Sequence, residues 1–168
     1  MINWEELKHI HVIRKLEHIL GQWFHTEIFF VDERGQIKNY DAADRQREFK
    51  NPLCRTLLPH TEGRKILLDA IAQSGESLLK SQKHHQELAG PFGFEKVFAS
   101  AIVIEGEYLG CVYAYSFIEG KVAEAEIKKA RAQAESWKLD GENFQLAIQN
   151  MKAIDGGDKK YFFELVDL

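Results

Sequence analysis

Hydrophobic residues near the start of the chain recur with helical spacing. Between residues 4 and 23 they stand three or four positions apart, with charged residues between them: Trp4, Leu7, Ile10, Ile13, Leu16, Leu20 and Trp23. Such spacing places apolar side chains on one face of a helix. The pattern predicts an amphipathic helix over 4–23, with Asn3 as its N-cap and Glu6 three residues later.

After this helix the pattern changes to short β-rich runs separated by turn residues. Residues 26–31 predict a strand, and 36–40 predict a short second strand. Gly35 can supply the positive φ that the turn between them needs. The polar segment 41–51 then predicts a loop or a frayed helical turn.

Helical spacing resumes in the middle of the chain. Asn51 followed by Pro52 is a typical helix start, and it predicts a short helix that stops before Pro59. A second helix is predicted to follow and to end at Gly75, because glycine commonly terminates helices. Residues 77–88 predict a strand that leads into the turn "AGPFGF".

The segment 97–118, "VFASAIVIEGEYLGCVYAYSFI", has two apolar runs on either side of a turn. Successive side chains of a strand point to opposite faces, and neither face of these two runs is polar. A strand that is apolar on both faces must be covered on both. The hairpin is therefore predicted to occupy the middle of a sheet.

The last third of the chain predicts helices. Within 121–138, five residues alternate by four and three like the narrow stripe of a coiled coil: Ala123, Ile127, Ala130, Ala134 and Trp137. Further helices are predicted over 141–154 and from 158 onward. Because the last pattern is still apolar at Leu168, we expect that the chain was cut from a longer protein or that a partner completes this helix.

The order of these elements predicts an α+β fold. We expect a central antiparallel sheet with the N- and C-terminal amphipathic helices packed on one face. Residues 1–120 would form the core with its N-terminal helix, and residues 121–168 would form a C-terminal helical extension. A length of 168 residues suits one domain of this kind.

Composition limits the class of protein. Apolar residues make up 45% and charged residues 29%, which is typical of a folded domain. The net charge of -4 gives no basic surface for phosphates, so direct nucleic-acid binding is not expected. Charged residues interrupt the hydrophobic run at the N-terminus, so we expect neither a signal peptide nor a membrane helix. Cys54 and Cys111 match no disulfide framework, and a cytoplasmic location is expected.

Motifs that carry catalysis are missing from the sequence. It has no glycine-rich phosphate loop, no G-x-S-x-G elbow and no H-E-x-x-H zinc motif, and its histidines have no zinc-site spacing. Cys54 lies early in a predicted helix beside Arg55, where a thiol pKa is lowered, so a reactive thiol is the alternative to a buried one. We expect a binding or regulatory module with no enzymatic activity, no metal and no cofactor.

The hairpin and the loop before it carry aromatic residues of the kind that line ligand pockets. Such pockets are mostly apolar with a few placed polar groups. The candidate ligand-binding residues are Phe94, Phe98, Ile102, Cys111, Tyr113, Tyr115 and Phe117. The alternative is that these side chains are simply part of the hydrophobic core.

Two stretches of the sequence resemble a known family. "LCRTLLPHTEGRKILLDAIAQSGESL" is similar to a cysteine-containing helix followed by a glycine and a second helix, and "HHQELAGPFGFEKVFASAIVIEGEYLGCVYAYSF" is similar to a glycine turn and hairpin. Through them, residues 53–118 resemble the PocR-type sensory family, a branch of the GAF/PAS-like domains. The chain departs from that family where Ile66–Leu68 and Lys83–His85 replace cysteines, and where Ser100 or Ala101 replaces a proline.

The resemblance implies a GAF/PAS-like fold and a regulatory role. A domain of this family would be a cytoplasmic sensor in a bacterial signalling protein, would bind a small molecule and would form a homodimer through its terminal helices. It would pass the signal to an attached output module, such as a sigma-54-type transcription activator or a histidine kinase. The alternatives are a pocketless GAF-like interaction or dimerisation domain, and a thiol-based GAF-like reductase that uses Cys54 or Cys111.

Overall fold

Helices and strands in the computed structural model give an α+β fold, as predicted. The structure describes residues 15, 17–19, 25–40, 48–81, 84–151, 153, 157, 158 and 160. The strands of these residues are β1 (Glu27–Asp32), β2 (His85–Ala89), β3 (Lys96–Ile104) and β4 (Glu107–Phe117). The helices are α3 (Pro52–Leu57), α4 (Thr61–Ser81), α5 (Glu124–Ser136) and α6 (Gly141–Gln149).

The strands form one antiparallel sheet in the order β1-β4-β3-β2. The β3–β4 hairpin occupies the two inner positions, with β1 hydrogen-bonded to β4 and β2 to β3. This confirms the prediction for residues 97–118, which rested on the apolar character of both faces.

The predicted second strand at 36–40 is wrong in part. Only Ile37 forms a β-bridge, with Val31. The side chain of Asn39 completes the pairing instead: its Oδ1 accepts from the Phe30 N–H at 2.9 Å and its Nδ2 donates to the Ile28 carbonyl at 2.7 Å. A side-chain amide thus takes the place of a neighbouring strand on the outer side of β1.

Asn51 begins α3 as predicted and also ties this helix to the sheet. Its Oδ1 accepts from the backbone N–H groups of Leu53 and Cys54, at 3.0 and 3.1 Å. Its Nδ2 donates to the carbonyls of His25 and Ser116, at 3.0 and 3.2 Å. Because Asn51 is fully buried, these bonds satisfy the amide of a side chain that water does not reach.

The second predicted helix does not end at Gly75. It continues to Ser81 as α4, so the strand predicted over 77–88 is restricted to β2 at its end. Gly75 faces the sheet, where an added Cβ would lie 3.9 Å from Cys111 Sγ and from Val31 Cγ1. The glycine marks a close approach of the helix to the strands and not a helix end.

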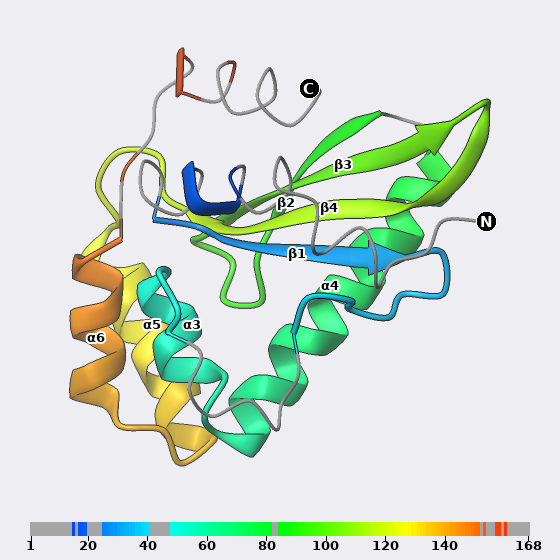
Figure 1. Ribbon diagram of the computed structural model, residues 1–168. Coiled ribbons are helices and arrows are strands. Elements are labelled where there is room, and N and C mark those ends of the chain that lie inside the picture. Colours follow the sequence, from blue (N-terminus) through cyan, green and yellow to red (C-terminus); the bar gives the residue numbers. More distant parts are fainter. Residues whose placement is uncertain are drawn as a thin grey trace.

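Helices α3 to α6 lie on one side of the sheet, with α4 running along it and α5 and α6 grouped with α3 at one end (Figure 1). Helix α4 contacts β3 and β4, whereas α6 packs mainly on α3 and α5. The hydrophobic core lies between these helices and the facing side of the sheet and includes Phe29, Val31, Val97, Leu67, Ile71, Ala134 and Phe144.

Of the terminal helices predicted to pack on one face of the sheet, α5 and α6 are described. Most of the helix predicted over 4–23 and of the one predicted from 158 onward lies outside the described residues. In the predicted stripe of α5, Ala130 and Ala134 are buried within this chain. Trp137 lies against Phe92 of the β2–β3 loop, with ring centroids 5.4 Å apart.

Candidate functional site

The seven residues predicted to line a pocket lie on both faces of the sheet. Phe98 and Phe117 lie on the side away from α4, with their ring centroids 4.6 Å apart, and Ile102 follows the same alternation as Phe98. The other four belong to the core beneath the helices: Phe94, Cys111, Tyr113 and Tyr115. The structure therefore brings four of the seven together and separates them from the other three.

A bulge explains the position of Phe117. Tyr115 pairs with Val97 but Phe117 pairs with Lys96, so Ser116 is an extra residue in β4. One extra residue reverses the alternation of side chains beyond it. The sequence alternates regularly through this stretch and therefore placed Phe117 on the same face as Tyr115.

Tyr113 and Tyr115 lie within the hydrophobic core and expose no surface to solvent. Both rings are fully buried, and Phe94 and Leu88 pack in the same cluster. The Tyr115 hydroxyl donates to Glu95 Oε1 at 3.2 Å, and the Tyr113 hydroxyl forms a hydrogen bond with the Ser74 side chain. Burial raises the pKa of both phenols, so they are neutral hydrogen-bonding groups of the core.

Glu95 is a buried carboxylate that the sequence analysis did not select. Its Oε1 accepts from the Phe92 N–H at 2.9 Å and from the Tyr115 hydroxyl, while Oε2 has no partner among the described residues. Burial raises its pKa from 4.5 to about 7, and the hydrogen bonds from Phe92, its own backbone and Tyr115 oppose this rise only in part. The signal in the sequence was its place in "FGFEKVF", where apolar residues surround one carboxylate.

Both cysteines are buried, and no disulfide joins them. Burial raises the pKa of Cys111 to about 12, although a hydrogen bond with the Tyr108 hydroxyl lowers it in part. The thiolate is the nucleophilic form of cysteine, and at neutral pH Cys111 is a neutral thiol. This environment is that of a core residue.

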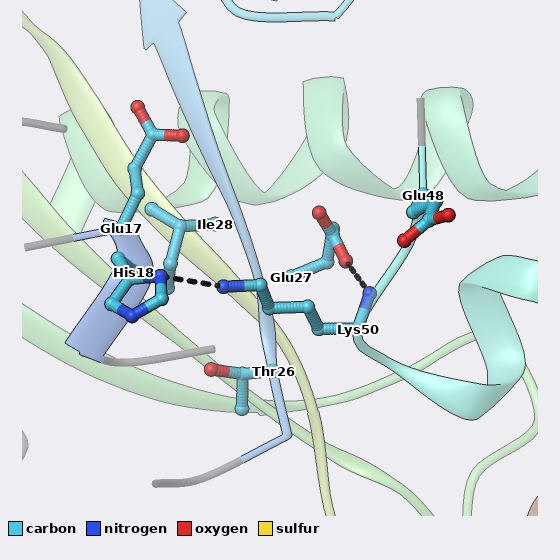
Figure 2. A pocket seen from close by; sticks show the side chains of 7 residues that line it. All are labelled: Glu17, His18, Thr26, Glu27, Ile28, Glu48 and Lys50. Carbon is cyan, nitrogen blue, oxygen red and sulfur yellow. Dashed lines mark hydrogen bonds between the residues drawn. The ribbon is translucent and has the colours of Figure 1, made fainter. Parts of the chain in front are cut away.

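A small pocket of about 250 Å³ lies beside β1, and Figure 2 shows the side chains around it. Lys50 Nζ lies 3.3 Å from His18 Nδ1, and the Lys50 N–H donates to Glu27 Oε2 at 2.9 Å. The Asn51 N–H also reaches Glu27 Oε2, at 3.4 Å. The Glu27 carboxylate thus holds the start of α3 to the sheet, which is a structural task.

A larger groove of about 870 Å³ opens where β4 leads into α5. Ile118, just after β4, Ile127 of α5 and Ile148 of α6 provide its apolar surface. Lys121, Lys128 and Arg131 also line it, together with Glu124 and two glutamines of α6. Its volume lies in the range of small-molecule sites, which makes this groove the candidate functional site.

The sequence analysis did not predict the groove because its walls come from separate segments. Ile127 belongs to the coiled-coil-like stripe predicted within 121–138, and Ile148 lies in the separate helix predicted over 141–154. Only the fold brings both beside the residues that follow β4. The local signal was "GKVAEAEIKKAR", in which cations alternate with apolar residues directly after the hairpin.

Other kinds of site were sought among the described residues. No group of three or more His, Cys, Asp or Glu side chains there is arranged to hold a metal ion. In the same part of the chain, no helix has the length and apolar character needed to cross a bilayer. Comparison of the sequence with protein-family models and with curated proteins gives no match.

Proposed function

We propose that this chain is a non-enzymatic sensory domain of the GAF/PAS-like kind, which binds a small molecule and passes the signal through its C-terminal helices to an output module. The observation that carries the proposal is the position of the groove. Its walls come from the segment that leaves β4 and from α5 and α6, which follow the sheet in the chain. A ligand in the groove would contact the sheet exit and both helices together.

Such a site can act on α5 and α6 only if the ligand favours one arrangement of them over another. The helices have few alternatives at their buried side, because Ala130, Ala134 and Phe144 are fixed in the core. The groove side is open, so a ligand there would add contacts between α5, α6 and residues 118–122. These added contacts are the differential interaction that the proposal requires.

Native mass spectrometry of the purified chain tests the proposal. We expect a retained small molecule or, after screening soluble metabolites by thermal shift, a compound that raises Tm by several degrees. Ile127→Glu places a charge on the apolar surface of the groove and should abolish the binding. Leu146→Glu is the matched control, since Leu146 is an exposed apolar residue of α6 that does not line the groove. Equal binding by both variants would contradict the proposed site.

A pocketless interaction domain is the second candidate, and one observation favours it. Tyr113, Tyr115 and Phe94, three of the residues predicted to line a pocket, belong to the hydrophobic core, against which Leu88 also packs. A chain whose mass shows no retained molecule, whose Tm no metabolite raises, and which is dimeric in the same native spectra would select this candidate over the sensory domain.

A further inference from the structure

The groove is lined by more cations than carboxylates, although the net charge of the chain is negative. Lys121, Lys128 and Arg131 line the groove with a single carboxylate, Glu124, although the chain as a whole has a net charge of -4. Among the described residues, no carboxylate forms an ion pair with Lys121 or Lys128. Arg131 is ion-paired with Glu135, at 3.0 Å between Nε and Oε1, so the excess positive charge of the groove comes from Lys121 and Lys128.

Arg131 is held in place by both helices that form the groove. Its Nε donates to Glu135 Oε1 on α5 at 3.0 Å, and its Nη1 donates to Gln145 Oε1 on α6 at 2.8 Å. A guanidinium carries five N–H donors in a rigid plane, so these two bonds orient it and leave donors for another acceptor. Arg131 is thus a preorganised cation at the groove wall.

The groove also has an apolar surface. Ile148 and Ile118 are almost fully buried beneath it, and Val122 and Ile127 are partly buried. A small hydrophilic anion is not the best match for this groove, because it would leave the apolar surface exposed to water. The groove fits a ligand whose body is apolar and whose end is charged.

We propose that the groove binds a free, soluble amphipathic anion, an organic carboxylate or phosphate monoester with an aliphatic body. The anionic group would lie among Lys121, Lys128 and Arg131, and the aliphatic body would cover Val122 and Ile127, with Ile118 and Ile148 beneath them. This inference rests on the proposed function, because it assigns a chemical class to the ligand of the same groove.

Titration with octanoate and octyl phosphate tests the inference, with octan-1-ol and octylamine as neutral and cationic probes of the same chain length. Backbone amide NMR shifts locate each probe. We expect both anions to shift amides of residues 118–131 and 145–149, with affinities at least about tenfold above that of octan-1-ol. A tenfold difference in affinity corresponds to about 1.4 kcal/mol.

Charge reversal separates the anion site from general apolar binding. The double variant Lys121→Glu/Lys128→Glu should bind octanoate about tenfold or more weakly and should keep the wild-type affinity for octan-1-ol. Lys65→Glu/Lys80→Glu is the control, because these are exposed lysines of α4 outside the groove. Both substituted pairs are exposed, so the fold should be retained.

The possible results distinguish this inference from the function on which it rests. Equal affinities for octanoate, octan-1-ol and octylamine would overturn the anion inference while leaving a ligand-binding groove. A preference for octylamine, or co-sedimentation with phosphatidylglycerol vesicles without binding of free octanoate, would also overturn it. If no probe shifts the groove amides and native mass spectra show a bare chain, both the inference and the proposed function fail.

Discussion

At the scale of single residues, Glu95 is the clearest case of a side chain set by its surroundings. It is fully buried, and its neighbours Tyr115 and Tyr113 are uncharged phenols. The hydrogen bond that its Oε1 accepts from the Phe92 N–H fixes the loop before β3. The ring centroids of Phe92 and of Phe144 on α6 lie 4.7 Å apart. The protonation of one carboxyl group is thus linked to the contact between this loop and α6.

The raised pKa of Glu95 predicts how stability depends on pH. In the unfolded chain Glu95 ionises near pH 4.5, but in the folded protein it stays protonated up to about pH 7. Between these values the folded state binds more protons, so the free energy of unfolding falls as pH rises. The rise in the pKa of Glu95 corresponds to a decrease in the free energy of unfolding on the order of 3 kcal/mol, which is complete above pH 7.

Urea unfolding from pH 4 to 8 measures this contribution. Glu95→Gln removes the titration while keeping an acceptor for Phe92, so its profile should lack the fall between pH 4.5 and 7. Glu76→Gln, which changes an exposed carboxylate of α4, should retain the wild-type profile. Parallel profiles for wild type and Glu95→Gln would contradict the assignment.

At the scale of elements, α4 shows how packing overrides a local signal. Gly75 predicts a helix end, yet the helix continues for six residues beyond it and buries Leu78. Burial of Leu78 contributes about 1.5–3 kcal/mol, which exceeds the cost of about 1 kcal/mol for glycine inside a helix. The tertiary contact therefore decides the length of α4.

Two glycines of α4 predict opposite effects of the same substitution. Gly75→Ala should stabilise the protein by about 0.5–1 kcal/mol, because the new Cβ would meet Cys111 Sγ and Val31 Cγ1 at an ordinary 3.9 Å. Gly63→Ala should destabilise it by about 1–3 kcal/mol, since its Cβ would lie 2.7 Å from the Leu57 carbonyl oxygen. Thermal unfolding of both variants checks the signs, and a loss of Tm in Gly75→Ala would show that the approach is tighter than this geometry.

The sequence predicts the individual helices and strands better than the contacts between them. The hairpin, the start of α3, α5 and the first part of the helix predicted over 141–154 follow from periodicity and capping, which act over a few residues, whereas α6 already ends at Gln149. The bulge at Ser116, the extra length of α4 and the place of Asn39 depend on contacts between segments distant in the sequence. The aromatic residues of the candidate pocket were correctly expected to be apolar and covered, but composition does not distinguish a covered core from a lined cavity.

The groove illustrates the same limit for the candidate site. Its cations and its apolar residues are visible in "GKVAEAEIKKAR", but Ile148 is distant in sequence from Ile118. Their proximity depends on the turn between α5 and α6 and on the docking of α6 on α3. A site of this type can be found only after the fold is known.

At the scale of the whole molecule, one core unites the sheet with α3 to α6. Phe29 of β1 and Phe144 of α6 belong to the same cluster, and so do Leu53 of α3 and Ile71 of α4. The described parts of residues 1–120 and 121–168 are therefore packed together through a shared core. A change at the groove acts on a body that includes the sheet.

The amide of Asn39 also has a consequence for how copies of this protein behave towards one another. Unpaired N–H and C=O groups along an outer strand attract strands of other molecules, and proteins cover them to avoid aggregation. Asn39 occupies the Phe30 N–H and the Ile28 carbonyl. Together with the backbone hydrogen bonds that Gln36 and Lys38 form with Asp32 and Phe30, this side chain blocks the outer strand against intermolecular β-pairing.

Asn39→Ala should therefore aggregate faster than the wild type. Its folded state would lose about 1–3 kcal/mol through the two uncovered backbone groups, so light scattering is compared at equal intervals below the Tm of each protein. Gln36→Ala is the control, because the hydrogen bond to Asp32 Oδ1 at this position comes from the backbone N–H. Equal scattering by both variants would mean that other features protect β1. Faster aggregation of Asn39→Ala would show that the solubility of this protein depends in part on one amide that the hydrophobic pattern of the sequence does not reveal.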